Sequence, residues 1–319
     1  MDASGGRTDG RRERVNDARH FLVVSHTGRQ SALEATGEVC SQLLAAGAVP
    51  VVASEHWNDV HASVPELNGA VRRFEETDSA LIELVIVLGG DGTILRAAEL
   101  MREYPVAPLL GVNLGHVGFL AESERDDLGY TVARALARDY AVEERMTLSV
   151  RAKVGDEVVY ESWALNEATV EKAERERMLE VVVEVDRRPL SSFGCDGIVM
   201  STPTGSTAYS FSAGGPVVWP SLEAILLVPL SAHALFARPL VVGADSSLAV
   251  EILQRTEAAA VIWCDGRRTF DLPPGARVIV RKSSVPVRLA RLHEAPFTDR
   301  LVNKFQLPVT GWRGPVGRD

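Results

Sequence analysis

The pentapeptide Gly89-Gly90-Asp91-Gly92-Thr93 places glycines, a carboxylate and a hydroxyl between a strand-like run and a helix-like segment. Glycines let the backbone adopt positive φ and approach a ligand closely, and the first turn of a helix offers unpaired N–H groups with a partial positive charge. These residue types in this order predict a loop that can hold phosphate groups. A simpler alternative is a strand-to-helix turn in which Asp91 or Thr93 only caps the helix.

Other common phosphate-binding motifs are missing from the sequence. No GxGxxG follows a first strand, as in dinucleotide-binding Rossmann folds, and no GxxxxGK[ST] phosphate loop occurs. An aspartyl-phosphatase nucleophile would need a second carboxylate two residues before Asp91, where Gly89 stands. The function of the glycine loop therefore has to be inferred together with other segments of the chain.

Three later segments share their pattern with one family of kinases. The glycine loop itself resembles a phosphate-binding signature that NAD kinases share with diacylglycerol kinases, sphingosine kinases and phosphofructokinases. Residues 113–120 (NLGHVGFL) resemble the NxGxxGFL element of NAD kinases, residues 165–168 (LNEA) their Asn-Glu element, and residues 196–216 their longest signature, which contains TPTGSTAY. With these four elements in the same order, the chain resembles the NAD kinase family. Weaker similarity continues through the HxxxxRP of residues 233–239 and the turn at residues 265–266.

This resemblance implies an enzyme that transfers a phosphoryl group from ATP or polyphosphate to the 2′-hydroxyl of the adenosine ribose of NAD, giving NADP. Asp91 is then the general base that takes the proton from this hydroxyl. Because phosphoryl transfer depends chiefly on positioning and charge neutralisation, Mg²⁺ is expected to bridge the donor phosphates, and no protein ligand for it can be named. The residues expected to bind the phosphate donor are Gly89, Gly90, Gly92, Thr93 and Arg96.

The NAD site implied by the resemblance draws on residues far apart in the sequence. Asn166 can donate and accept hydrogen bonds whereas an ionised Glu167 only accepts, so this pair suits ribose hydroxyls or an adenine amine. Without the resemblance, Arg177 would belong to a solvated hairpin, Asp196 to a turn and residues 202–212 to a capped helix start. The residues expected to bind NAD are Asp91, Gly92, Asn113, Asn166, Glu167, Arg177, Asp196, Thr207, Ala208, Tyr209, Ser210, Phe211 and Ser212.

The first part of the chain alternates strand-like and helix-like segments. Residues 81–88 (LIELVIVL) form the strongest strand signal, a continuous apolar run typical of a strand buried on both faces of a parallel sheet. Alternation of this kind predicts an α/β domain with a mostly parallel sheet. Further strands are predicted at residues 20–25, 49–53 and 108–112, and helices at residues 32–46, 93–103 and 126–138.

Beyond Arg145 the pattern changes to short alternating runs separated by turn residues, which predicts a β-rich, sandwich-like second domain. Its strands are predicted at residues 149–154, 158–163, 179–185, 198–201, 225–229, 248–252, 260–264, 277–281 and 285–292. We therefore divide the chain into a disordered tail (1–19), an α/β domain (20–145), a β-rich NAD-binding domain (146–292) and a helical C-terminal segment (293–319). The last segment is expected to pack back on the first domain.

Composition limits the partners and the location of the protein. The net charge is −9 and Lys/Arg clusters are short, so nucleic acid is not an expected partner. Three separated cysteines argue against a disulfide framework, and the chain carries neither a membrane-length apolar stretch nor a secretory signal, which favours the cytoplasm. The resemblance further implies a homo-oligomer, a dimer or a tetramer.

Two other functions stay open at this point. A lipid kinase of the diacylglycerol or sphingosine type would share the glycine loop, but it has no reason to carry the other three NAD kinase elements. A regulator that binds NAD without catalysis would keep the NAD-binding residues, and an intact Asp91 speaks against it.

Overall fold

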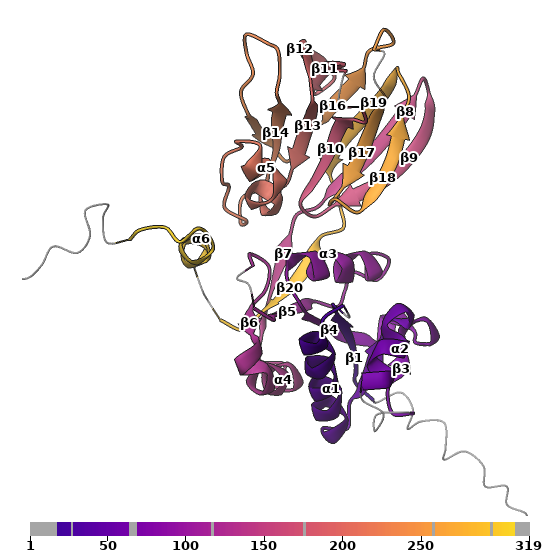
Figure 1. The fold of residues 1–319 in the computed structure, drawn as a ribbon, viewed down its shortest axis with the longest axis vertical. Helices are drawn as coiled ribbons and strands as arrows, with labels where there is room; N and C mark the ends of the chain where they lie inside the picture. Colours follow the sequence, from indigo (N-terminus) through magenta and orange to yellow (C-terminus); the bar gives the residue numbers. More distant parts are fainter. Residues whose placement is uncertain are drawn as a thin grey trace, which may run out of the picture. The chain divides into compact units, whose positions relative to one another are not determined.

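The computed structural model describes residues 18–26, 28–63, 69–115, 118–174, 177–256, 259–293 and 296–309, so the predicted N-terminal tail lies outside the described residues except for its last two positions. The chain forms two compact units (Figure 1). The first contains the chain up to Val142 together with residues 290–294, and the second contains residues 143–289 and the C-terminal segment from Ala295. The boundaries predicted from the sequence were 145/146 and 292/293.

The first unit is built on an eight-stranded sheet in the order β3-β2-β1-β4-β5-β20-β7, with β6 paired to β5. The pairs β1–β2, β2–β3, β1–β4, β4–β5 and β5–β6 are all parallel, which confirms the predicted α/β class. The strands are β1 (His20–Ser25), β2 (Val49–Val52), β3 (Arg72–Arg73), β4 (Ile82–Leu88), β5 (Leu109–Asn113), β6 (Ser123–Glu124), β7 (Ala141–Arg145) and β20 (Val287–Arg291).

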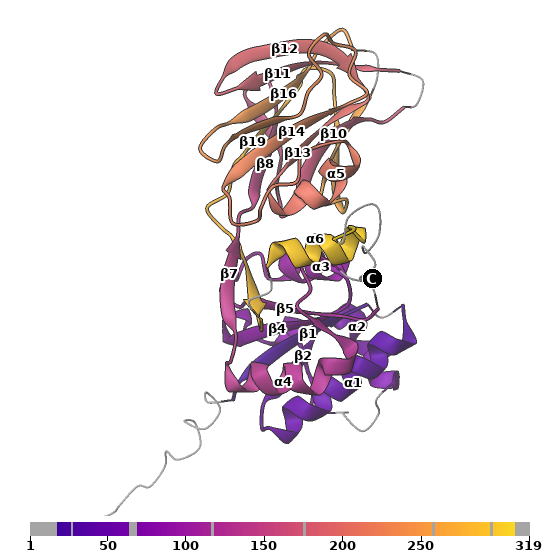
Figure 2. The same cartoon turned by 90° about the vertical axis from the view of Figure 1, so that its left-hand side faces the viewer.

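Helices cover both faces of this sheet. The chain runs from β1 to β2 in one direction along the sheet and from β4 to β5 in the other, so right-handed crossovers put α1 and α3 on opposite faces. Figures 1 and 2 show α3 on one side of the sheet and α1 with α4 on the other. The helices are α1 (Gln30–Ala45), α2 (Ser54–Ser63), α3 (Asp91–Leu100) and α4 (Leu128–Ala137), with single 3₁₀ turns at Phe74–Glu76, Ser79–Leu81 and Arg125–Asp127.

Strand β4 explains why the sequence signal at residues 81–88 is so strong. Six of its seven residues are buried, because side chains on both faces of the strand pack under helices. Leu84, Ile86 and Leu88 on one face join the main core of the unit, where they meet Phe21, Val39 and Leu43. A strand covered on both faces cannot alternate polar and apolar residues.

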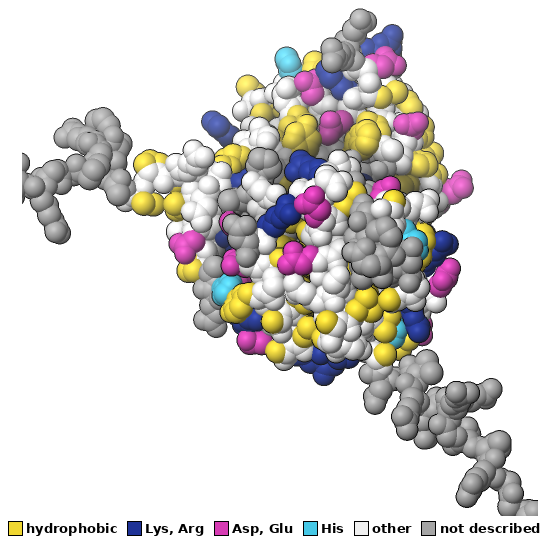
Figure 3. Space-filling view, turned by 60° about the horizontal axis from the view of Figure 1, so that its bottom comes forward, with side chains coloured by type: hydrophobic (Ala, Val, Ile, Leu, Met, Phe, Trp, Pro, Cys, Tyr) yellow, Lys and Arg dark blue, Asp and Glu magenta, His cyan; other side chains and the backbone are white. Residues whose placement is uncertain are grey.

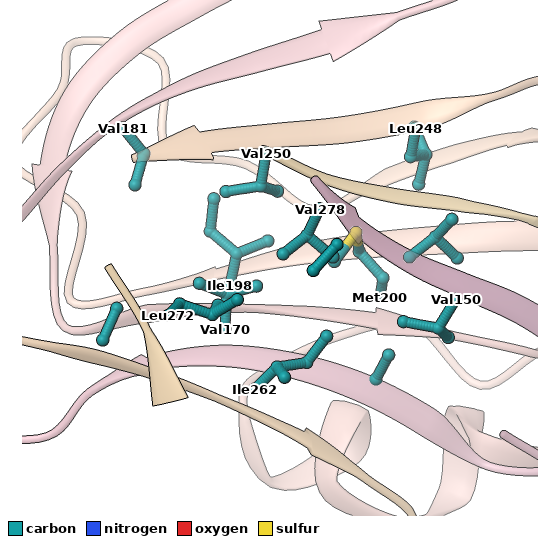
Figure 4. Close-up of a cluster of buried hydrophobic side chains, with 14 of the residues drawn as sticks. Val150, Val170, Val181, Ile198, Met200, Leu248, Val250, Ile262, Leu272 and Val278 are labelled. Carbon is teal, nitrogen blue, oxygen red and sulfur yellow. The ribbon is translucent and has the colours of Figure 1, made fainter. Parts of the chain in front are cut away.

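The second unit consists of two six-stranded antiparallel sheets, as predicted for the β-rich domain. One sheet has the order β15-β14-β13-β10-β17-β18 and the other β12-β11-β16-β19-β8-β9. In Figure 4, Val170, Ile198 and Ile262 of the first sheet lie opposite Val181 and Val250 of the second within one apolar core. The strands are β8 (Leu148–Val154), β9 (Glu157–Ala164), β10 (Glu167–Lys172), β11 (Leu179–Val185), β12 (Arg188–Cys195), β13 (Gly197–Ser201), β14 (Ala224–Leu230), β15 (Leu240–Gly243), β16 (Leu248–Ile252), β17 (Ala260–Cys264), β18 (Arg268–Leu272) and β19 (Ala276–Lys282).

The C-terminal helix α6 (Phe297–Phe305) makes aromatic contacts within the second unit. Phe305 stacks on Phe211 of the short helix α5 (Tyr209–Ser212), with ring centroids 4.5 Å apart. Phe297 meets the edge of Trp219 at 5.3 Å. These contacts are made within the second unit, and the expected packing of this segment on the first unit stays a prediction.

The remaining sequence expectations concern cysteines, membranes and charge. Cys40, Cys195 and Cys264 are free and buried, and burial raises the pKa of the Cys40 thiol to about 12. Among the described residues, no helix has both the length and the apolar character to cross a membrane. On the face drawn in Figure 3, basic and acidic side chains are interspersed.

Candidate active site

The glycine loop leaves the sheet where the strand order reverses. Strands β1 and β4 are parallel neighbours, and the chain continues from β1 toward one edge of the sheet and from β4 toward the other. Open α/β sheets bind ligands beside the carboxyl ends of such strands, at the point of reversal. The loop that follows Leu88 at the end of β4 therefore has the position of a ligand-binding loop.

Within the loop, backbone hydrogen bonds fix the start of helix α3. The N–H of Gly89 donates to the carbonyl of Val112 in the neighbouring strand β5 at 2.9 Å. Gly90 is the N-cap residue of α3, and its carbonyl accepts the N–H of Thr93 at 2.9 Å. Because Gly90 occupies the cap, neither Asp91 nor Thr93 has the purely capping role left open by the sequence. The space beside Gly90 and Gly92 is open, which leaves their backbone accessible to a ligand.

Asp91 lies in the first turn of α3, and the segment after β5 holds its carboxylate from the other side. One carboxylate oxygen accepts the N–H of Phe119 and the other accepts the N–H of Leu120, both at 3.0 Å. Gly118 lies so close that a Cβ there would stand 2.4 Å from Asp91 Oδ1. The last residues of the NxGxxGFL element therefore fix the carboxylate of the glycine loop.

The other predicted residues of the first unit lie on the same elements. Thr93 is buried in the first turn of α3, and Arg96 is half-buried one turn farther along. Asn113 is buried at the end of β5, the strand next to β4. The structure thus gathers the predicted donor-binding residues on one loop and the helix after it.

In the second unit, a buried carboxylate that we did not predict as a site residue organises the Asn-Glu element. Asp265 accepts the N–H of Leu165 at 2.9 Å, of Asn166 at 2.7 Å and of Glu167 at 3.3 Å. Arg268 donates to the same carboxylate at 2.8 Å. Burial raises the pKa of Asp265, while the N–H groups of Leu165 and Asn166 lower it. The sequence signals for this residue were its position in an Asp-Gly turn and the weaker family similarity of that turn.

Glu167 has a buried carboxyl with few hydrogen bonds. The residue is 8% exposed, and among the described residues Oε2 has no hydrogen-bond partner. Burial and, to a smaller extent, the negative charge of Asp265 raise the pKa of Glu167, the backbone N–H of Tyr209 lowers it, and the net pKa is about 8. At neutral pH the group is therefore mostly a neutral acid that can donate a hydrogen bond as well as accept one.

The TPTGSTAY segment packs directly on the Asn-Glu element. The Thr202 hydroxyl donates to the carbonyl of Leu165 at 2.6 Å, and the Thr202 N–H donates to the carbonyl of Asn166 at 2.9 Å. A Cβ on Gly205 would stand 2.0 Å from the same Asn166 carbonyl oxygen, so this close approach requires glycine. Two of the elements that carry the resemblance thus form one corner of the second unit.

The residues that follow this corner have different environments. Thr207 and Ala208 are half-buried, and Tyr209 is 39% exposed. Ser210 is buried, with its hydroxyl against Gly215, where a Cβ would come within 2.5 Å of it. Phe211, which stacks on Phe305, and Ser212 are exposed.

Asp196 and Arg177 lie apart from this corner and have ion partners of their own. Asp196, between β12 and β13, pairs with Lys172 at 2.5 Å, and this partner lowers the pKa of the Asp196 carboxyl. Arg177 is exposed, 3.9 Å from Glu174. The described residues contain no group of three or more His, Cys, Asp or Glu side chains that could hold a metal ion.

Comparison with known proteins identifies the family. The sequence pattern of the ATP-NAD kinase N-terminal domain matches residues 21–140, and that of the ATP-NAD kinase C-terminal domain matches residues 165–292. An NAD kinase of Leifsonia xyli is 73% identical over 301 residues, which cover 94% of this chain and 99% of that protein. NAD kinase 2 of Streptomyces coelicolor is 58% identical and covers 94% of this chain and 98% of its own length.

Solved structures share the fold. The crystal structure of yeast NADH kinase complexed with NADH has a TM-score of 0.81 at 23% identity, and the match covers 94% of this chain and 89% of that chain. An NAD kinase from Archaeoglobus fulgidus in complex with ATP has a TM-score of 0.62 at 27% identity, covering 81% of this chain and 98% of that chain.

The glycine-rich loop at the reversal point of the α/β sheet, together with these family matches, places the protein among the kinases that act on a nucleotide. The chain belongs to the NAD kinase family, and its activity is that of an NAD kinase. The lipid kinase and the non-catalytic regulator that the sequence left open find no support in these relatives.

Proposed function

We propose that this enzyme transfers the γ-phosphoryl group of ATP to the 2′-hydroxyl of the adenosine ribose of NAD, with Asp91 as the general base. The observation that carries the proposal is the Asp91 carboxylate, which the N–H groups of Phe119 and Leu120 fix in the first turn of α3. A carboxylate held in this way can accept the proton of a hydroxyl that attacks a phosphorus atom. In this step a bond forms between the ribose oxygen and the γ-phosphorus, and the bond between the γ-phosphorus and the ADP oxygen breaks. ADP leaves, and the proton of the hydroxyl goes to Asp91.

The backbone beside Asp91 is suited to the phosphates of the donor. Gly90 and Gly92 leave open space, and the first N–H groups of α3 carry the partial positive charge of a helix N-terminus. Arg96, on the next turn, can add a formal positive charge. The Archaeoglobus relative was solved in complex with ATP, which supports ATP as the donor. Polyphosphate offers the same phosphoryl chemistry and stays an alternative donor.

The second unit provides the groups that bind NAD in this proposal. Asn166 has its backbone fixed by Asp265 and its amide is available for ribose hydroxyls or the adenine amine. Glu167 has the buried oxygen Oε2 without a partner among the described residues, so a ligand hydroxyl or amine can complete its hydrogen bonds. Tyr209 offers a partly exposed ring beside them.

We further propose that Mg²⁺ accompanies the donor phosphates. The described side chains form no cage of three or more metal ligands, so phosphate oxygens and water would supply most of its coordination. The ion would neutralise phosphate charge, which a protein with a net charge of −9 cannot do by its overall field.

The oligomeric state and the location also belong to the proposal. Leu235, Phe236 and Val241 of the second unit are highly exposed for large apolar side chains, which supports a homo-oligomer. If sedimentation velocity at micromolar concentration found only a monomer, the homo-oligomer would be contradicted.

Three buried free thiols support a location in the reducing cytoplasm. Detection of the protein only outside the cytoplasm after cell fractionation would contradict this location.

The test is NADP formation by the purified protein from NAD and Mg²⁺, with ATP and polyphosphate in parallel. We expect product with ATP, and Asp91→Asn should lower kcat by roughly 10²- to 10⁴-fold because the base is lost. NAD binding by calorimetry should change little in this variant. Omission of Mg²⁺ with added chelator should abolish turnover.

A matched control is Asp271→Asn, which makes the same chemical change at an exposed position of β18. This variant should keep the turnover of the parent enzyme. If Asp91→Asn also turned over at a near-parental rate, Asp91 would not be the base.

A further inference from the structure

Leu120, which helps to hold Asp91, is itself held at both of its backbone polar groups. Its N–H donates to Asp91 Oδ1 at 3.0 Å, and its carbonyl accepts from Arg291 Nη1 at 3.2 Å. Arg291 is the last residue of β20 and lies 171 positions farther along the chain. Arg291 belongs to none of the four motifs quoted from the sequence, yet it contacts the residue that holds the predicted base.

Arg291 is fixed in turn by Glu122. The two side chains form an ion pair of 2.9 Å and are only 10% and 1% exposed. The other oxygen of Glu122 accepts the N–H of Leu292 at 3.1 Å and of His293 at 2.9 Å. The backbone N–H of Glu122 donates to Gly111 of β5 at 2.8 Å. Glu122 therefore connects the segment that holds Asp91 to β5 and to the end of β20.

This geometry depends on the shape of the arginine side chain as well as on its charge. One nitrogen of the guanidinium reaches both the Leu120 carbonyl and the Glu122 carboxylate. A planar guanidinium keeps such a pair of bonds at fixed angles, whereas a lysine ammonium is a compact charge on a flexible stem. The pair is buried, so removal of one partner leaves an uncompensated charge and disturbs its surroundings.

We propose that Arg291 and Glu122 are positioning residues for catalysis: they fix the Leu120 backbone, and through it the Asp91 carboxylate, in the orientation needed to accept the proton. The inference rests on the proposed role of Asp91. Neither residue contacts the substrate in this proposal, so their effect belongs to the rate of reaction and not to the affinity for NAD.

The first test is Arg291→Lys, which keeps the charge but not the planar guanidinium. Small displacements of a catalytic group cost up to about 10²-fold in rate, so we expect kcat to fall roughly ten- to hundredfold with KM for NAD within about twofold of the parent. Glu122→Gln, which keeps the shape and loses the charge, should act in the same direction. All rates are divided by the folded fraction, measured by tryptophan fluorescence.

The matched control is Arg288→Lys in the same strand. Arg288 pairs with Glu144 at 3.0 Å, but the two side chains are 35% and 56% exposed. Exposed pairs contribute little, so this variant should keep the parental kcat. If Arg291→Lys also kept the parental kcat per folded molecule, the positioning role would be excluded.

The decisive measurement is the double variant Asp91→Asn/Arg291→Lys. If Arg291 acts through Asp91, its substitution should have little further effect once the base is gone, so the double variant should match Asp91→Asn. If Arg291→Lys lowered kcat by the same factor in the parent enzyme and in Asp91→Asn, the proposal would be overturned. Arg291 would then have only a general structural role. A fully active Asp91→Asn variant would instead contradict the proposed role of Asp91 as the base. The effect of Arg291→Lys on kcat would still be measured separately, so the two failures can be told apart.

Discussion

Glu167 and Asp265 are neighbouring buried carboxyls that the second unit treats differently. Asp265 accepts three backbone N–H groups and an arginine nitrogen. Glu167 has the Tyr209 N–H, and its oxygen Oε2 has no partner among the described residues. The first group can keep a negative charge in the interior, whereas the second is easier to bury as a neutral acid. A buried oxygen without a partner costs stability, and its position beside the residues proposed to bind NAD is what we expect of a group kept for a ligand.

This cost gives a pH-dependent prediction for Glu167→Gln. Between the ordinary glutamate value of 4.5 and the folded value of about 8, the folded protein holds a proton that the unfolded chain has released, so stability is lost as pH rises through this interval. Glutamine resembles the protonated acid and avoids the loss. We expect the variant to be more stable by less than about 1 kcal/mol at pH 5 and by up to about 3 kcal/mol at pH 7, measured by urea unfolding.

The comparison uses Glu161→Gln as its control, because Glu161 is 59% exposed and pairs with Arg151 on the surface. The control should track the parent protein at both pH values. A stability difference for Glu167→Gln that did not grow between pH 5 and pH 7 would show that the carboxyl is not protonated in the folded protein.

Among the secondary structure elements, buried strands were predicted best. Strands β1, β11, β16 and β17 have the predicted bounds, because apolar side chains recur along each of them. Strand β12 was missed because it lies at the edge of its sheet, where half of its residues are exposed and Pro189 is tolerated. Local pattern reports burial, so an exposed edge strand gives little signal.

Helix α2 and strand β10 were missed for different reasons. Helix α2 is short and carries mostly polar residues, so no clear apolar stripe marks it. Strand β10 contains Glu167, Glu171 and Lys172, although it pairs with β13 and β17 in the middle of its sheet. Charged residues in a central strand contradict its local pattern, and one of them, Glu167, belongs to the predicted NAD site.

The candidate site shows the same limit of local information. The glycine loop and the Asn-Glu corner could be located because contiguous motifs mark them. Asp265, Glu122 and Arg291 could not, because each acts on a segment about 100 or 170 positions away. No spacing rule connects residues that meet only through the order of strands in a sheet.

At the scale of the molecule, the first unit is not a continuous stretch of sequence. The chain leaves it through β7, forms the second unit and returns through β20, which lies between β5 and β7 in the first sheet. Strand β20 also carries Arg291 to the segment that holds Asp91. The fold of the first unit, and the backbone that holds the Asp91 carboxylate, therefore depend on β20, which follows the whole second unit in the sequence.

The first unit also depends on one acidic side chain that connects segments distant in the sequence. Glu83, at the start of β4, accepts from Arg138 at the C-terminal end of α4 and from Arg19, just before β1. Arg19 in turn donates to the carbonyl of Leu136 at 2.6 Å. The Arg138 guanidinium, followed by that of Arg19, lowers the pKa of the Glu83 carboxyl to about 2.

Because the folded pKa of Glu83 lies below its ordinary value of 4.5, the stabilisation is complete above pH 4.5 and is lost as pH falls toward 2. Glu83→Gln should therefore cost about 1 to 3 kcal/mol at pH 7, with the lower part of this range allowing for the solvent exposure of Arg138. The gap to the parent protein should narrow steadily between pH 5 and pH 3 in urea unfolding experiments. Glu76→Gln, whose side chain is 70% exposed and 3.9 Å from Arg73, should have no comparable effect. A Glu83→Gln gap that stayed constant down to pH 3 would mean that packing of the side chain, and not its charge, stabilises the unit.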